Sequence, residues 1–265
     1  MKILISAVLI NAASVHGIAT ASDDIPISKK QPATKGLFDG ASSTSLGIGA
    51  AYVPRYEGSD QHRWRALPLI DIRRGRFFLG IGGMGVDLSA NEGTQFGPRI
   101  GYRVGRKESY STHRQGLGTI HSGAEAGLFL RKQIGAMFIR GNISSAVGNA
   151  AKGITAQLGS GYHMRIGTDN HLIVDASLNW ADGNYTATYF GVTTQQALAS
   201  GLNSYDAGAG IKSYGVGLNW THSFAAGWFS NMGIRASRLV GDAADSPIVE
   251  TKTQLMSTAA AGYRF

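Results

Sequence analysis

Cysteine is absent from all 265 residues of the chain. This absence excludes a disulfide framework, a thiol nucleophile and a thiolate metal site. Proline is also scarce, with 6 residues against 37 glycines. Abundant glycine without a collagen or low-complexity period is typical of curved sheets, where glycine permits kinks and close approach of backbones. Such a chain depends on hydrogen-bonded sheet, packing or a membrane for its stability.

A continuous apolar run of the about 20 residues that a transmembrane helix needs is also missing. The N-terminus begins with Met1-Lys2, continues with an apolar stretch over 3–10 and reaches Ala19-Thr20-Ala21. One positive charge, a short apolar core and an A-x-A site are typical of a secretory signal peptide. We therefore predict a signal peptide over residues 1–21, rather than a buried N-terminal helix, and a polar periplasmic arm over residues 22–43.

The formal net charge is +8. A basic exported protein more readily meets anionic envelope polymers or lipid head groups than nucleic acid. Strand alternation spreads the basic residues, and no nucleic-acid-binding module is visible. We expect outer-membrane lipids, and no nucleic acid, among the partners.

From Thr44 onward, apolar side chains alternate with polar or small ones, which is the period of a β-strand. Twelve segments follow this pattern, and many approach the ~10 residues of a tilted membrane strand. The number is even, as in single-chain outer-membrane barrels, and ten strands is the alternative. The sequence thus predicts an all-β fold, a closed antiparallel transmembrane barrel over residues 44–265. The segments are 44–52, 64–73, 77–87, 97–104, 122–131, 137–143, 156–166, 172–180, 184–190, 214–221, 228–238 and 253–265.

Several local features qualify this pattern. Pro68 lies within a strand and predicts a bulge, because proline lacks a backbone donor. Asp182-Gly183 is a hairpin signal that implies a short strand over 184–190. Residues 194–200 are compatible with one or two turns of helix. Counting strand directions places the long connector Gly105–His121 on the periplasmic side.

The last strand, residues 253–265, carries Tyr263 and Phe265 on one face. This ending resembles the assembly signal of bacterial outer-membrane barrels, although the last strand of a soluble sandwich has the same alternation. We expect this strand to close the barrel against the strand near Leu46–Tyr52, because closure removes exposed edges.

The two faces of the strands differ in chemistry. Aromatic residues lie on the apolar faces, mostly near strand ends, as in the interfacial girdles of membrane barrels. The opposite faces carry eight arginines and three acids, which cannot occupy a dry core but can line a wet lumen. This cluster is either an anion-preferring pore or acidic-ligand site, or a set of ion pairs that rigidifies the lumen. Its members are Arg65, Asp71, Arg73, Arg99, Arg103, Glu125, Arg131, Arg140, Arg165, Asp175 and Arg235.

Catalytic patterns are not evident. Ser160 and His163 differ in strand parity and therefore point to opposite faces. No nucleophile elbow, metal-ligand pair or P-loop is present. Asp242 and Asp245 share a loop and could bind a cation, but solvation is the simpler interpretation. We predict that the chain is not an enzyme and has no cofactor or metal.

Several stretches resemble the MipA/OmpV family of outer-membrane proteins, over about residues 44–265. They are PRYEGSD, LPLIDIRRGRFFLG, GMGVDL, GPRIGYRVGR, AEAGLF, TYFGVT, ALASGLNSYDAGAGIK, SRLVGDAADSPIV and the terminal YRF. The resemblance implies an outer-membrane barrel without known catalytic residues. The family includes scaffolds that hold a membrane-bound lytic transglycosylase together with a bifunctional peptidoglycan synthase. It also includes members described as adhesins or surface antigens. The motif residues Pro54, Arg55, Tyr56, Gly58, Ser59, Gly241, Asp242, Asp245, Ser246 and Pro247 are interpreted as structured loops first and contact sites second.

Three functional hypotheses follow for a protein of the cell outer membrane. The first is a non-enzymatic scaffold that contacts peptidoglycan-remodelling enzymes through the arm Ser22–Ser43 or the connector Gly105–His121. The second is a passive pore or importer for small solutes through the arginine-rich lumen. The third is a surface adhesin that acts through the loop Gly191–Lys212.

Overall fold

The computed structural model describes residues 42–89, 93–110, 115–148 and 152–265. The predicted signal peptide and nearly all of the predicted arm lie outside the described residues. The first strand begins at Ser42, two residues before the predicted start of the barrel.

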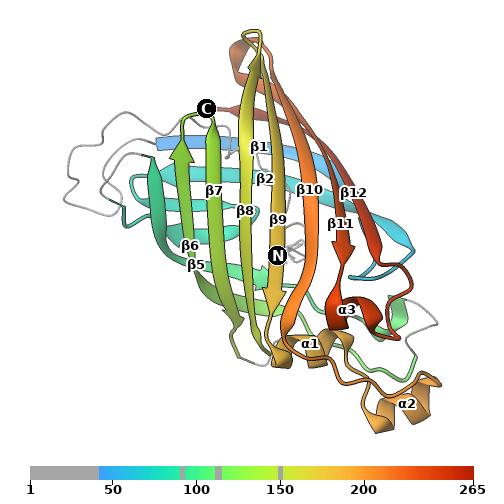
Figure 1. The fold of residues 1–265 in the computed structure, drawn as a ribbon. Coiled ribbons are helices and arrows are strands. Elements are labelled where there is room, and N and C mark those ends of the chain that lie inside the picture. The colour runs from blue at the N-terminus through green and yellow to red at the C-terminus, as the bar shows by residue number, and fades with distance from the viewer. Residues whose placement is uncertain (1–41, 90–92, 111–114, 149–151) are drawn as a thin grey trace, which may run out of the picture.

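Twelve antiparallel strands form one closed barrel in which sequence neighbours pair, as Figure 1 shows. The strands are β1 (Ser42–Pro54), β2 (His62–Arg74), β3 (Phe77–Gly80), β4 (Gly83–Val86), β5 (Thr94–Arg103), β6 (Gly123–Ile134), β7 (Met137–Ala146), β8 (Ile154–Ile166), β9 (Asn170–Ala181), β10 (Gly210–Ser223), β11 (Trp228–Leu239) and β12 (Thr253–Arg264). The helices are α1 (Gly183–Phe190), α2 (Thr194–Ser200) and α3 (Gly241–Asp245), with 3₁₀ turns at Glu108–Tyr110 and Ala225–Gly227.

The first and last strands close the barrel. Their register runs from Ser45 opposite Arg264 to Tyr52 opposite Ser257. The backbone N–H of Phe265 donates to the carbonyl of Thr44 at 2.9 Å and extends this ladder by one bond. The predicted pairing of the C-terminal strand with residues 46–52 is therefore confirmed.

Large apolar side chains cover the outside of the barrel. Ile48 is 72% exposed and Trp64 is 71% exposed, and similar residues occur on strands all round the wall. Side chains of opposite parity point inward and are mostly polar, charged or small. A soluble sandwich would bury its apolar face, whereas a membrane barrel presents that face to lipid. The exposed belt therefore indicates a bilayer as the surroundings. Among the described residues, no helix is long and apolar enough to cross a membrane.

Two errors in the predicted strand pattern compensate each other. Residues 77–87 do not form one strand, since β3 and β4 pair as a hairpin that turns between Gly80 and Gly83. Gly83 has a φ of +118°, which a residue with a Cβ rarely adopts. Residues 184–190 are not a strand but helix α1, because the side chain of Asp182 caps the helix by accepting from the N–H of Tyr185 at 2.8 Å. The helix predicted over residues 194–200 is confirmed as α2.

The bulge predicted at Pro68 is also wrong. Pro68 lies opposite Ile48 in an uninterrupted register between β1 and β2. On its other side, β2 pairs with β3 over Ile72–Arg74. The missing donor of Pro68 therefore disrupts no ladder at this position.

The extra hairpin changes which end of the barrel holds each connector. Because β3 and β4 reverse the chain twice, β5 runs toward the end where β1 finishes. The connectors that follow β1, β5, β7, β9 and β11 leave the barrel at this loop end. The turns that follow β2, β6, β8 and β10 and the C-terminus lie at the opposite end, the turn end. The described residues of the connector Gly105–His121 thus lie at the same end as the connector after β1, whereas the predicted strand count placed the two connectors at opposite ends. We assign the turn end to the periplasm, because barrels of this class have short periplasmic turns and longer external loops.

Candidate functional site

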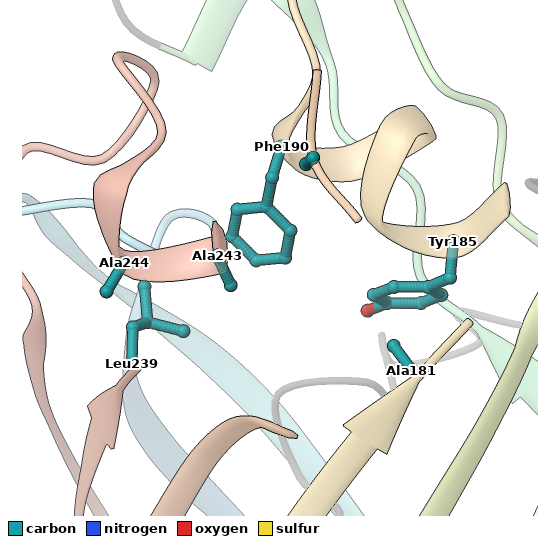
Figure 2. Packing of buried hydrophobic residues seen from close by; sticks show 7 residues of the cluster. Ala181, Tyr185, Phe190, Leu239, Ala243 and Ala244 are labelled. Atoms are coloured by element: carbon teal, nitrogen blue, oxygen red, sulfur yellow. The ribbon is translucent and has the colours of Figure 1, made fainter. Parts of the chain in front are cut away.

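The loops at the external end pack into a cap with its own apolar core. Figure 2 shows the ring of Phe190 beside Ala243 and the ring of Tyr185 close to Ala181. Phe190 is 1% exposed, so α1 is fixed against α3 and the adjoining strand ends. A second cluster joins Tyr56, Leu117, Val192 and Ile248 from four separate connectors. The cap is therefore built by residues from most of the external loops.

Two of the family-motif loops interlock within this cap. The hydroxyl of Tyr56 donates to the carboxylate of Glu250 at 2.7 Å. The carbonyl of Gly58 accepts from the N–H groups of Glu250 and Thr251 at 2.8 and 3.0 Å. Gly58 has a φ of +99°, and a Cβ there would lie 2.8 Å from a methyl group of Val249. The motif residues at 54–60 thus hold the loop that precedes β12.

The remaining motif residues have structural contacts. Asp242 accepts from the N–H of Gly208 at 2.7 Å, and Asp245 pairs with Lys252 at 2.8 Å. Ser246 donates to the carbonyl of Phe190. Ser59 and Pro54 are buried, Arg55 and Pro247 are half-buried, and Gly241 has a φ of +56°. Within the described ranges, no group of three or more His, Asp or Glu residues could hold a metal ion.

A cavity lies between the cap and the lumen wall. Its volume is ≈ 160 Å³. One wall is a row of polar side chains on four successive strands. Asn142 donates to Gln157 at 3.1 Å, Gln157 donates to Asn179 at 2.9 Å, and Asn179 donates to Ser213 at 3.1 Å. The cavity is therefore wide enough for water and lined by groups that hydrogen-bond.

Two tyrosines of α1 form the roof of the cavity. The rings of Tyr185 and Tyr189 stack with centroids 4.4 Å apart and planes at 21°. Lys212 forms an ion pair with Glu57, and its ammonium lies 5.0 Å from the centroid of Tyr185. Burial, and then the nearby Glu57 carboxylate, raise the pKa of Tyr185 well above 10. Burial, and then Tyr185, also raise the pKa of Tyr189.

Several of the predicted lumen charges form ion pairs between strands that are adjacent or one strand apart. Arg103 and Glu125 pair at 3.2 Å, and each side chain is 3% exposed. Asp175 holds both Arg140, at 2.9 Å, and Arg235. These contacts link β5 with β6 and β7 with β9 and β11. They connect the strands of the wall, and Arg103, Glu125 and Arg235 also line the cavity.

Other predicted lumen residues lie apart from these pairs. Arg73 is 3.8 Å from Asp71, and Arg99 donates to the carbonyl of Gly82. Arg131 lies 3.4 Å from a ring nitrogen of His163 and stacks over Phe138. Arg65 is half-buried, and Arg165 is exposed near the turn end. The structure therefore divides the predicted cluster among several separate sites.

Sequence reasoning missed the cap residues Glu57, Arg106, Tyr185, Tyr189 and Lys212. The interpretation of Asp182-Gly183 as a hairpin concealed that α1 covers the lumen. The sequence did contain an indication of the helix, because Tyr185 and Tyr189 are four residues apart and would fall on one helix face. The same aspartate that favours a tight turn is also a preferred helix cap.

We expect ionisation of Tyr185 and Tyr189 only when the cap unfolds. In the unfolded chain both side chains ionise near pH 10, whereas the folded cap retains their protons. The unfolded state then loses protons first, so the free energy of unfolding falls as pH rises above 10. Tyrosinate absorbance of the folded protein, compared with the Tyr185→Phe/Tyr189→Phe variant, measures this. Equal numbers of tyrosines titrating near pH 10 in the two folded proteins are the expected result, and two additional tyrosines titrating near pH 10 in the folded wild type would contradict the expectation.

One family model matches nearly all of the described barrel. The family model described as MltA-interacting protein MipA matches residues 46–265. The comparison with curated proteins gives no match. Among solved structures, the N-terminal β-barrel domain of Pseudomonas aeruginosa OprF matches at 9% identity and a TM-score of 0.28, covering 84% of this chain and 97% of that chain.

Two further solved structures have similar statistics. The outer membrane channel DcaP of Acinetobacter baumannii matches at 7% identity and a TM-score of 0.38, covering 85% of this chain and 96% of that chain. The CymD monoaromatic hydrocarbon channel matches at 12% identity and a TM-score of 0.43, covering 86% and 90% of the two chains. Likenesses this distant say nothing about function. The family match extends over nearly all of the barrel, so this chain is an outer-membrane β-barrel that belongs to the MipA family.

Proposed function

We propose that the barrel is a non-enzymatic scaffold that holds a lytic transglycosylase at the inner surface of the outer membrane. The observation that carries this proposal is the match to a family described as MltA-interacting protein. A peptidoglycan synthase is proposed as a further member of the complex. Such a role requires binding surfaces from this chain and no chemistry.

The turn end supplies a surface suited to this role. Seven cationic side chains lie there among the described residues, against three aspartates and the terminal carboxylate. They are Arg73, Arg74, Arg76, Arg131, Lys132, Arg165 and Arg264, against Asp71, Asp87 and Asp169. The external end is nearly balanced, because acidic loop residues offset its lysines and arginines. A positive rim favours a partner with an acidic surface and speeds its approach.

The contact surface assigned to this role differs from the earlier prediction. The connector Gly105–His121 lies at the external end, away from periplasmic enzymes. The arm Ser22–Ser43 lies almost entirely outside the described residues and stays a prediction. We therefore place the contact on the turns β2–β3 and β6–β7, where Arg74 and Lys132 are exposed.

Charge reversal tests this assignment. We expect the triple variant Arg74→Glu/Arg76→Glu/Lys132→Glu to bind a purified lytic transglycosylase at least about tenfold more weakly, because rim charges mainly set association. Binding is measured by surface plasmon resonance with the full barrel in lipid nanodiscs, at low and high salt.

The matched control reverses three exposed lysines at the external end: Lys107→Glu/Lys152→Glu/Lys252→Glu. This variant has the same change in net charge and is expected to bind like the wild type. Equal binding by both variants and the wild type would place the contact elsewhere. A loss confined to the control would reverse the assignment of the two ends.

The cavity favours a second candidate, a passive pore or importer for small solutes. Its polar wall is suited to water and hydrophilic solutes. Planar-bilayer recordings of the purified barrel test this candidate, and no discrete current would count against it.

The adhesin hypothesis has support from α2, where Leu198 is 85% exposed. Loss of cell attachment on Leu198→Asp substitution is its test.

A further inference from the structure

We infer that the cavity beneath the cap is a binding site for a small anionic, hydroxyl-rich solute of the sugar-acid class. The scaffold role does not require such a site, so this inference goes beyond it and does not rest on it. Three features of the cavity carry it: the balance of charge, the polar row and the aromatic roof.

The first feature is an excess of positive charge around the cavity. Among the described residues, five cationic side chains line the cavity: Arg55, Arg103, Arg106, Lys212 and Arg235. Two acidic side chains also line it, Glu57 and Glu125. Asp175 offsets Arg235 from just outside the lining. Within the described part of the chain, cationic side chains thus outnumber acidic ones around the cavity, and their summed field favours one carboxylate. The favourable energy is larger here than in water because the cavity is partly enclosed.

These cations are built into the wall. Arg103 is 2% exposed, Arg106 is 3% exposed and Arg235 is 7% exposed. Arg103 also donates to the carbonyl of Gly153 at 2.7 Å, and Arg106 donates to the carbonyl of Tyr189 at 2.7 Å. Because these contacts fix the guanidinium groups before any solute arrives, little side-chain entropy is lost on binding.

The second feature is the polar row. Asn142, Gln157, Asn179 and Ser213 repeat across neighbouring strands, whose spacing is about 4.8 Å. Amides and hydroxyls both donate and accept, as sugar hydroxyls do. A row of such groups suits a solute with several hydroxyls along one edge.

The third feature is the roof. Tyr185 and Tyr189 line the cavity together with the polar row. Small-molecule sites combine aromatic surface with a few placed polar groups, which fix the orientation of the ligand. The aromatic side suits the C–H face of a sugar ring.

Binding of D-glucuronate, with D-glucose as the neutral comparison, tests the inference. Isothermal titration calorimetry with the full chain in detergent is expected to show binding of glucuronate at least about tenfold tighter than that of glucose. Absence of glucuronate binding by the wild type would overturn the inference. Equal affinity for the two sugars would overturn its anionic part.

Matched lysine variants locate the site. Lys212→Met removes the ammonium that faces the cavity, and we expect it to weaken glucuronate binding at least about tenfold. Lys252→Met removes an exposed lysine that also pairs with an acid, and we expect no change. Equal losses in both would place binding outside the cavity.

Two further variants separate binding from folding. Lys212→Arg keeps the charge and is expected to retain binding. Asn179→Ala leaves every charge in place, interrupts the polar row and is expected to weaken glucuronate and glucose alike. Heat-dependent gel mobility confirms that each variant forms a barrel. Full binding by both Lys212→Met and Asn179→Ala, each as a folded barrel, would contradict the proposed site.

Discussion

Replacing Asp175 with asparagine is expected to lower the free energy of unfolding by about 3 kcal/mol, because it leaves two cations without their shared buried anion. The Asp175 side chain is 2% exposed, and it pairs with Arg140 at 2.9 Å and with Arg235. Arg235 has a second contact, with Ser177 at 3.2 Å, which cannot neutralise its charge. Urea unfolding in lipid vesicles, followed by tryptophan fluorescence, measures the change.

Asp169→Asn is the control for this substitution. Asp169 is exposed in the turn between β8 and β9, so the same chemical change is expected to alter stability by less than about 0.5 kcal/mol. If Asp175→Asn and Asp169→Asn unfold at the same urea concentration, the ion pairs do not stabilise the lumen. Removing all three charges together, as Arg140→Met/Asp175→Leu/Arg235→Met, is expected to restore much of the lost stability, because no charge is then left unpaired.

Truncation after Gly262 is expected to lower the amount of folded barrel in the outer membrane at least about tenfold, because unpaired backbone groups in lipid cost several kcal/mol each. Tyr263 lies opposite both Leu46 and Trp228, so its loss removes pairing on both sides of β12. Phe265 packs edge-to-face on Tyr263 with centroids 4.8 Å apart. Immunoblots of membrane fractions, with heat-dependent mobility, measure the folded amount.

Point variants distinguish pairing from an aromatic signal. Phe265→Ala keeps the backbone bond to Thr44 and removes only the ring. Phe224→Ala removes an exposed ring from the turn β10–β11 at the same end, and is expected to assemble normally. Poor assembly of Phe265→Ala alone would show that the ring is read as a signal. Normal assembly of the truncated chain would contradict both interpretations.

The alternation of side chains predicted most of this fold. Leu172, Val174 and Leu178 mark β9 clearly, because a half-buried strand imposes a period of two on its sequence. The closure of β12 on β1 followed from a different rule, that a closed barrel leaves no exposed strand edge. Residues 77–87 were misread, because Gly80, Gly82 and Gly83 leave no side chain to show a reversal.

The candidate site was harder to predict. The inward arginines were recognised individually, but their partners depend on which inward side chains of nearby strands reach each other. Asp175 meets Arg235 from a strand two positions away, a contact that strand parity alone cannot specify. The cap depends on loops whose sequences have no regular period. Nothing in the sequence around Glu57 and Lys212 therefore indicated that these two side chains would meet.

The interlocked loops carry a consequence for the order of folding. Tyr56 and Glu250, which join them, are 194 residues apart in sequence. Contacts at such separation form late, because the ends of a long flexible chain must first be brought together. The meeting of β1 and β12 brings these two loops side by side, so cap formation follows closure of the wall. An intact cap therefore marks a finished barrel, and an unfinished one exposes its external loops to proteases.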